Sequence, residues 1–134
     1  MRPEQEFALQ WIRNAEHDLL SAKAVIASAY DITDLPCFFA RQTVEKSLKA
    51  LLTWHGVSFG KTHDLLVLLA EAVMFQPSFS DDRTLYEQLT GFAVEMRYPS
   101  SMSEPSLQEA RRFVSEAQEI LNPVKRGLAP TAEQ

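Results

Sequence analysis

The chain has 134 residues, of which 46% are hydrophobic and 23% charged, and its formal net charge is −5. This size and composition predict one globular domain with a single core. The acidic balance argues against broad, sequence-independent binding of nucleic acid, which needs a basic surface, although a local basic patch is still compatible with it. Cys37 is the sole cysteine, which excludes an internal disulfide and a multi-cysteine metal site.

A first amphipathic helix is expected from about Glu4 to Ala29. Asp18 falls close to its apolar side, where a carboxylate needs a cation or hydrogen-bond donors because an unpaired buried charge costs several kcal/mol. The alternative is that Asp18 lies at the edge of that side and is hydrated. The apolar positions recur at helical spacing, at Ala8, Trp11, Ala15, Leu19, Ala22 and Ile26.

The central helix is predicted from Asp34, as its N-cap, to about Trp54. Apolar residues gather on one side, at Ala40, Val44, Leu48, Leu51 and Trp54. Polar residues gather on the other side, at Gln42, Glu45, Lys46 and Lys49. Two interpretations of this polar side stay open. It is either a hydrated face, with Arg41–Glu45 and Glu45–Lys49 ion pairs at helical spacing, or a fixed polar array with a function.

Three further helices follow. Gly56 and Gly60 interrupt the central helix, and Thr62 is expected to cap a third helix over about 63–75, with His63 as a structural residue in its first turn. Ser80 is expected to cap a fourth helix over about 81–96. Ser106 and Glu109 form a capping box for the last helix.

These helices predict an all-α fold, because no strand-like alternation interrupts them. Short connections between long amphipathic helices favour an up-and-down antiparallel bundle of four main helices plus one additional helix. We expect a single domain over 1–134, ordered over about 4–122, with a frayed tail over 123–134 that begins at Pro123.

Several kinds of chemistry lack their sequence signals. The chain has no glycine-rich phosphate loop, and His17, His55 and His63 do not form a metal-binding pair, so we expect no cofactor and no metal. No run of 18 apolar residues predicts a membrane span, and the first residues have no signal-peptide pattern. The cytoplasm is therefore the expected compartment.

Four segments, taken in this order and spacing, resemble the HEPN family of small helical domains, named for nucleotide binding in higher eukaryotes and prokaryotes. The resemblance spans about residues 7 to 122. The segments are Trp11-x-x-x-Ala15-x-x-Asp18-Leu19-x-x-Ala22, Cys37-Phe38-x-x-x-Gln42-x-x-Glu45-Lys46-x-x-Lys49-Ala50, His63-Asp64-Leu65 and Arg97-Tyr98-Pro99.

The resemblance implies a helical bundle that forms a homodimer and is often encoded beside a minimal nucleotidyltransferase in bacterial toxin–antitoxin or stress systems. Many such toxins are metal-independent ribonucleases with an Arg-x4–6-His motif. This sequence departs from that pattern, because after Arg97 the corresponding positions hold Met102, Ser103 and Glu104, and no histidine follows Arg97.

The residues and the resemblance together suggest an anion-binding cleft. Arg97 would offer a planar fork for phosphate, and Lys46 and Lys49 would offer point charges. Tyr98 would offer an aromatic face on which a base could stack. Asp18 and Glu45 would hold the cations when the cleft is empty. In the alternative, Arg97 pairs with one of these carboxylates as an internal ion pair and Tyr98 simply packs.

Three functions follow from these alternatives. The first is a non-catalytic HEPN-type module that binds a nucleotide, an RNA end or a nucleotidyltransferase partner. The second is a ribonuclease that uses His63 with Arg97. The third is a purely structural dimer, whose partner patch would consist of exposed apolar residues such as Phe38, Phe39, Phe75 and Phe79.

Overall fold

The structure, a computed structural model, describes residues 1–92 and 104–128. Over these two ranges it contains helices and no strand, which confirms the predicted all-α class. Within the same ranges, none of the helices has the length and apolar character that crossing a lipid bilayer demands. The helices are α1 (Pro3–Ala27), α2 (Asp34–Trp54), α3 (Leu65–Ala72), the 3-10 helix η1 (Pro77–Asp82), α4 (Arg83–Thr90) and α5 (Leu107–Leu128).

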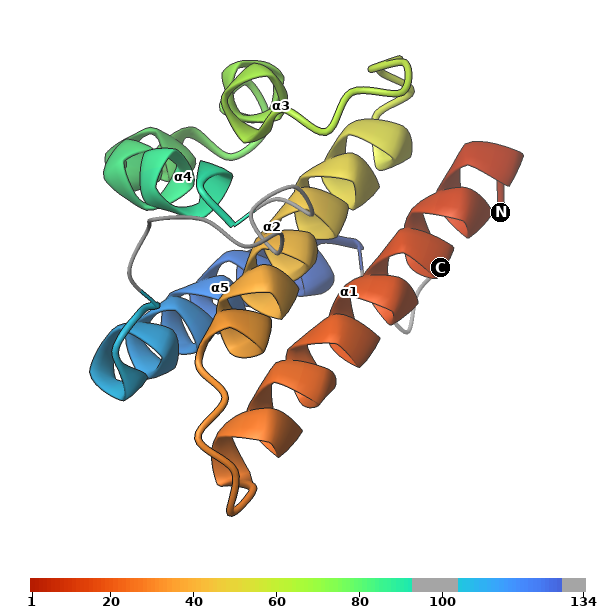
Figure 1. The fold of residues 1–134 in the computed structure, drawn as a ribbon. Helices are drawn as coiled ribbons and strands as arrows, with labels where there is room; N and C mark the ends of the chain where they lie inside the picture. Colours follow the sequence, from red (N-terminus) through yellow and green to blue (C-terminus); the bar gives the residue numbers. More distant parts are fainter. Residues whose placement is uncertain (93–103, 129–134) are drawn as a thin grey trace.

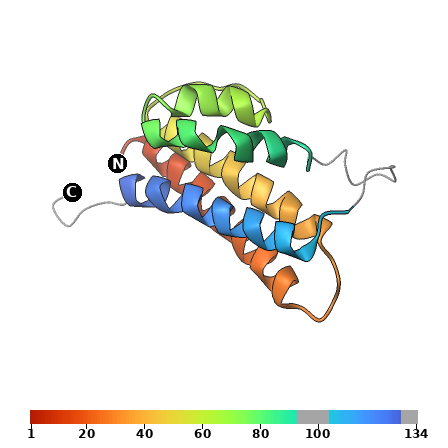
Figure 2. The ribbon, with the colours of Figure 1, turned by 90° about the vertical axis from the view of Figure 1, so that its left-hand side faces the viewer.

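Helix α2 is the centre of the bundle. It packs against α1 and α5 along its length and against the short helices α3 and α4 on another side. Helix α1 runs antiparallel to both α2 and α5, while α3 and α4 form a separate layer over α2 (Figures 1 and 2). Because α2 has neighbours on most sides, it is buried over most of its circumference, not only along its apolar stripe.

Small residues allow α1 and α2 to approach closely. Ala8, Ala15 and Ala22 recur every seven residues on α1, and all three have no exposed surface. The Thr43 hydroxyl of α2 donates to the Phe39 carbonyl one turn earlier, at 2.9 Å, and also lies 3.4 Å from the Ala15 carbonyl of α1. This close contact brings polar side chains of α2 within reach of α1.

The last helix is longer than the sequence indicated. Helix α5 continues through Pro123 to Leu128, and Val124 and Leu128 are 1% exposed. The predicted frayed tail from residue 123 is therefore wrong as far as Leu128. A proline inside a helix loses one backbone hydrogen bond, but burial of the two apolar side chains beyond it offsets that loss.

Two of the predicted helix starts are also wrong. Thr33, not Asp34, is the N-cap of α2, and Asp34 is the first helical residue. Asp64, not Thr62, caps α3, because its carboxylate accepts hydrogen bonds from the backbone N–H groups of Leu66 and Val67. The Thr62 hydroxyl instead accepts from the Asp64 N–H at 3.1 Å.

Of the predicted caps of the last two helices, the first is wrong and the second is confirmed. Ser80 lies inside η1 and caps no helix, and α4 begins only at Arg83. Of the helix expected over 81–96, residues 93–96 lie outside the described residues. The capping box before α5 is confirmed, because the Ser106 hydroxyl accepts from the Glu109 N–H at 3.0 Å and the Glu109 carboxylate accepts from the Ser106 N–H at 3.2 Å.

Candidate functional site

Three charged side chains form one line along α2. Arg41, Glu45 and Lys49 follow one another at four-residue spacing, and they are 6%, 3% and 4% exposed. Charged residues are almost never buried this far unless they are paired. The predicted Arg41–Glu45 and Glu45–Lys49 ion pairs are confirmed, but both are buried, so the interpretation of these residues as a hydrated face is wrong.

Glu45 is the shared partner in this line. One carboxylate oxygen, Oε1, accepts a hydrogen bond from Arg41 at 2.8 Å, and the other, Oε2, accepts from Lys49 at 3.0 Å. Oε2 also lies 2.9 Å from Nδ1 of His63. Burial raises the pKa of Glu45, but the hydrogen bonds from His63, Lys49 and Arg41 and the charge of Lys49 outweigh it, so the pKa lies below its ordinary value.

The connection between α2 and α3 covers this charged line. Gly56 and Gly60 have φ angles of 70° and 64°, in the left-handed region that glycine adopts most readily, and they turn the chain back across α2. The guanidinium of Arg41 donates to the backbone carbonyl of His63 at 2.6 Å. His63 precedes α3. This hydrogen bond anchors its backbone, while its side chain is 75% exposed.

Two aromatic rings enclose Lys49. Its ammonium lies 5.3 Å from the centre of the Trp11 ring on α1 and 5.6 Å from that of Phe59 in the α2–α3 connection. The two rings meet edge to face at 6.5 Å. Lys49 is therefore an interior cation, stabilised by Glu45 and by cation–π contacts. Its predicted contact with a ligand stays a prediction.

Lys46 is the more accessible cation of this helix. Its ammonium lies 2.6 Å from the Asp18 carboxylate of α1, and the two side chains are 22% and 15% exposed. Asp18 thus has the cationic partner that its place on the apolar side of α1 required. Lys46 and Glu45 are adjacent on α2, but their side chains point in different directions: Lys46 pairs with α1, whereas Glu45 contacts His63 of the α2–α3 connection.

The structure thus pairs Asp18 with Lys46 and Glu45 with Lys49, and it places the His63 ring beside Glu45. Arg97 and Tyr98, the other two predicted site residues, lie outside the described residues. Whether Arg97 approaches the lysines or a carboxylate therefore stays a prediction.

Two aromatic members of this site were not predicted as such. Helical spacing places Trp11 in the apolar stripe of α1, and Phe59 lies in an irregular segment where no periodicity indicates its contacts. Helical spacing predicts the ion pair of Arg41, but its hydrogen bond to the carbonyl of His63, 22 residues later, has no sequence signal. Arg41 Nε is buried without a hydrogen-bond partner within the described residues.

Cys37 takes no part in any site that the structure describes. Its side chain has no exposed surface, and burial, with the nearby carboxylates of Glu109 and Asp34, raises the pKa of the thiol to about 12. It is therefore protonated and inert at neutral pH. Over residues 1–92 and 104–128, no three His, Cys, Asp or Glu side chains are placed to hold a metal ion.

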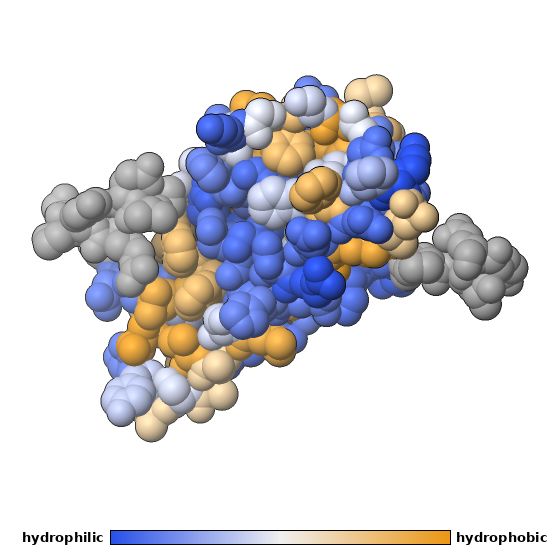
Figure 3. All heavy atoms as spheres, turned by 90° about the vertical axis from the view of Figure 1, so that its right-hand side faces the viewer, coloured by the Kyte–Doolittle hydropathy of each residue, from blue (hydrophilic) through white to orange (hydrophobic). Residues whose placement is uncertain are grey.

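The predicted aromatic partner patch is wrong for Phe79, and its other members are only partly exposed. Phe79 is 2% exposed, and Phe38, Phe39 and Phe75 are half-buried. The ring of Phe75 is covered by the imidazole of His55, which stacks on it at 4.0 Å. Large exposed hydrophobic residues occur elsewhere, including Leu20 at 64% and Ile32 at 36%. On the face that Figure 3 shows, hydrophobic residues lie at the lower left and again near the top, with mostly polar residues between them.

The domain model of the HEPN family matches residues 8–127. The chain belongs to the HEPN domain family. The crystal structure of an archaeal HEPN homologue is similar over 91% of this chain and 98% of that one, with a TM-score of 0.70 and 26% sequence identity. No curated protein matches this HEPN chain. The family and the helical fold that the sequence motifs suggested are thus confirmed.

Proposed function

We propose that this HEPN domain is a non-catalytic module that binds a nucleotide or an RNA end beside Lys46 of α2. The observation that carries the proposal is the cluster around Glu45, in which one buried carboxylate fixes two cations and an exposed imidazole. Charges that are already held in place cost little reorganisation when an anion arrives, which favours binding. The departure from the Arg-x4–6-His motif favours binding over cleavage.

The accessible groups suit an anionic ligand. The Lys46 ammonium has three N–H donors, and within the described residues it uses one of them, on Asp18. The His63 ring is exposed, with Nδ1 at Glu45, while Nε2 makes no hydrogen bond to any residue that the structure describes. Arg97 and Tyr98 would add the guanidinium fork and the stacking face for a base.

Titration calorimetry with ATP, GTP and a short RNA tests this proposal. We expect one of these ligands to bind, and Lys46→Ala and Arg97→Ala to weaken that binding about tenfold or more, because each removes a charge-assisted contact. Arg13→Ala is the matched control, because Arg13 is an exposed cation of α1 without a partner among the described residues. No binding by the wild type, or equal binding by both variants, would reject the nucleotide part.

The proposal extends to a partner, a minimal nucleotidyltransferase in a bacterial toxin–antitoxin or stress system. Support for this part comes from the family alone. It predicts a nucleotidyltransferase gene beside this one, and co-purification of the two products. A solitary gene, or a neighbouring nucleotidyltransferase that does not bind this chain, would remove the partner from the proposal.

One observation favours a second function, metal-independent ribonuclease activity with His63 and Arg97. A carboxylate at 2.9 Å from Nδ1 orients the His63 imidazole and leaves Nε2 available to exchange a proton with a substrate. Cleavage of total RNA by the wild type, lost in His63→Ala and kept in His17→Ala, would support this function. Cleavage that persists in His63→Ala would assign it to another source.

A further inference from the structure

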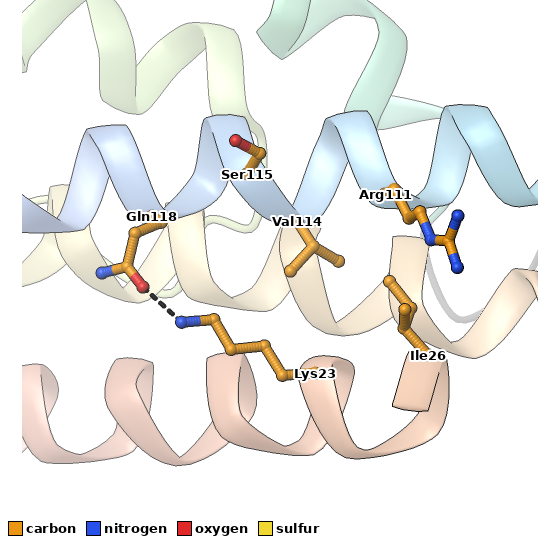
Figure 4. Close-up of a pocket in the computed structure, with 6 residues that line it drawn as sticks. All are labelled: Lys23, Ile26, Arg111, Val114, Ser115 and Gln118. Carbon is orange, nitrogen blue, oxygen red and sulfur yellow. Dashed lines mark hydrogen bonds between the residues drawn. The ribbon is translucent and has the colours of Figure 1, made fainter. Parts of the chain in front are cut away.

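A groove of about 340 Å³ lies between α1 and α5, away from the charged line of α2. Ile26 of α1 and Val114 of α5 form its apolar floor, and Ser115 and Gln118 of α5 add polar groups (Figure 4). Its volume is at the lower end of the range in which proteins bind small molecules. Lys23 and Arg111 complete the lining, and each brings an aliphatic stem with a charged head.

The two cations differ in their partners. The Lys23 ammonium donates to the Gln118 side chain at 2.6 Å, and Gln118 in turn donates to Asn122 at 2.7 Å, so one end of the groove is closed by a polar chain. Arg111 stands at the other end, near Ile26 (Figure 4), and makes no hydrogen bond or ion pair with the residues that the structure describes. Its fork of N–H donors is therefore available for a ligand.

The distance between the two ends of the groove limits the length of a ligand. Arg111 and Gln118 are seven positions apart on one helix, which corresponds to about 10 Å. Val114, between them, projects toward α1 (Figure 4). We propose that this groove binds an elongated amphiphile whose anionic head group pairs with Arg111 and whose apolar stem lies along Ile26 and Val114. A carboxylate or a phosphate monoester matches the guanidinium fork.

Amide chemical shifts of the full chain, recorded during titration with octanoate, octyl phosphate and octanol, test this assignment. We expect both anions to shift the amides of residues 23–26 and 111–118. The tighter of the two identifies the preferred head group. Octanol, which has the same stem without the charge, is expected to bind at least tenfold more weakly.

Arg111→Gln removes the charge and should weaken the anions about tenfold without changing the weak binding of octanol. Both Arg111 and Arg126 are exposed on α5, so Arg126→Gln serves as the matched control and should bind like the wild type. Thermal melts confirm that both variants fold. Equal binding of octanol and the anions, equal binding by Arg111→Gln, or no shifts at these amides with millimolar ligand would overturn the proposal.

Discussion

Glu45 is the residue whose surroundings explain most about this site. Glu45 is 3% exposed, and its carboxylate meets two buried cations and one exposed imidazole. Each cation has an additional contact: Arg41 bonds the His63 carbonyl, and Lys49 lies against two aromatic rings. Buried ion pairs are not strongly stabilising in themselves, but removing one member leaves the others unpaired in a medium of low dielectric constant.

Glu45→Gln should therefore destabilise the fold by about 3 kcal/mol, because two buried cations lose their counter-charge. Urea unfolding followed by circular dichroism measures the change. The control is Glu87→Gln, which removes an exposed ion pair of α4 with Arg83 and should cost less than about 0.5 kcal/mol. Similar losses of unfolding free energy in the two variants would contradict the conclusion that Glu45 neutralises two buried cations.

The same carboxylate predicts a dependence of stability on pH. Because the pKa of Glu45 is lower in the folded state than its ordinary value of 4.5, its contribution is fully present above that value. The contribution is lost as the pH falls through the folded-state pKa. The difference in unfolding free energy between wild type and Glu45→Gln should thus be largest near neutral pH and should shrink below about pH 4.5. A difference that stays constant down to about pH 3 would contradict this.

Among the structural elements, the connection between α2 and α3 supplies further contacts to the charged residues of α2. It places the backbone carbonyl of His63 on Arg41 and the ring of Phe59 on Lys49. Its path depends on two glycines in the left-handed region. A Cβ atom at Gly60 would meet no atom within 4 Å, so any cost of a side chain there is conformational.

Gly60→Ala should destabilise the fold by about 1 kcal/mol, because alanine disfavours the left-handed region. Gly127→Ala provides the matched control. Gly127 lies in α5, no atom is within 4 Å of a Cβ there, and alanine should stabilise that helix by about 0.5 kcal/mol or more. The melting temperatures of the two variants should shift in opposite directions. Shifts of the same sign would contradict the conclusion that the connection needs glycine at position 60.

The sequence predicts the bounds of the long helices well, but it does not predict which residues pack around them. Periodicity identified α1 and α2 within two residues at each end. It also placed Arg41, Glu45 and Lys49 on one side of α2, but a helical pattern does not show that Trp11 and a loop residue will cover that side. Pro123 predicts the end of α5, although Val124 and Leu128 continue its apolar spacing. Burial decided the outcome, and the local preference of proline did not.

The whole bundle brings pairs of polar groups that are distant in the chain into contact. Asp18 meets Lys46 across 28 positions, and Glu45 meets His63 across 18. The motifs of the HEPN family indicated that these segments belong together, and the structure shows that a central α2, flanked by α1 and the α2–α3 connection, is what joins them.

The family also predicts a homodimer. Exposed hydrophobic residues on α1 and after it, such as Leu20 and Ile32, provide apolar surface that a second copy could cover. Light scattering coupled to size exclusion should give twice the mass of the 15.2 kDa chain at micromolar concentration. A monomer at that concentration would count against an obligate dimer.

We expect Lys46 of α2 and the exposed His63 ring to bind an anion together with the segment that contains Arg97. The most direct measurement is amide chemical-shift mapping during titration with ATP, GTP and a short RNA. We expect one ligand to shift the amides around Asp18, Lys46 and His63 and those of Arg97 and Tyr98 together, with a single affinity. Shifts confined to other regions, or none with millimolar ligand, would contradict it.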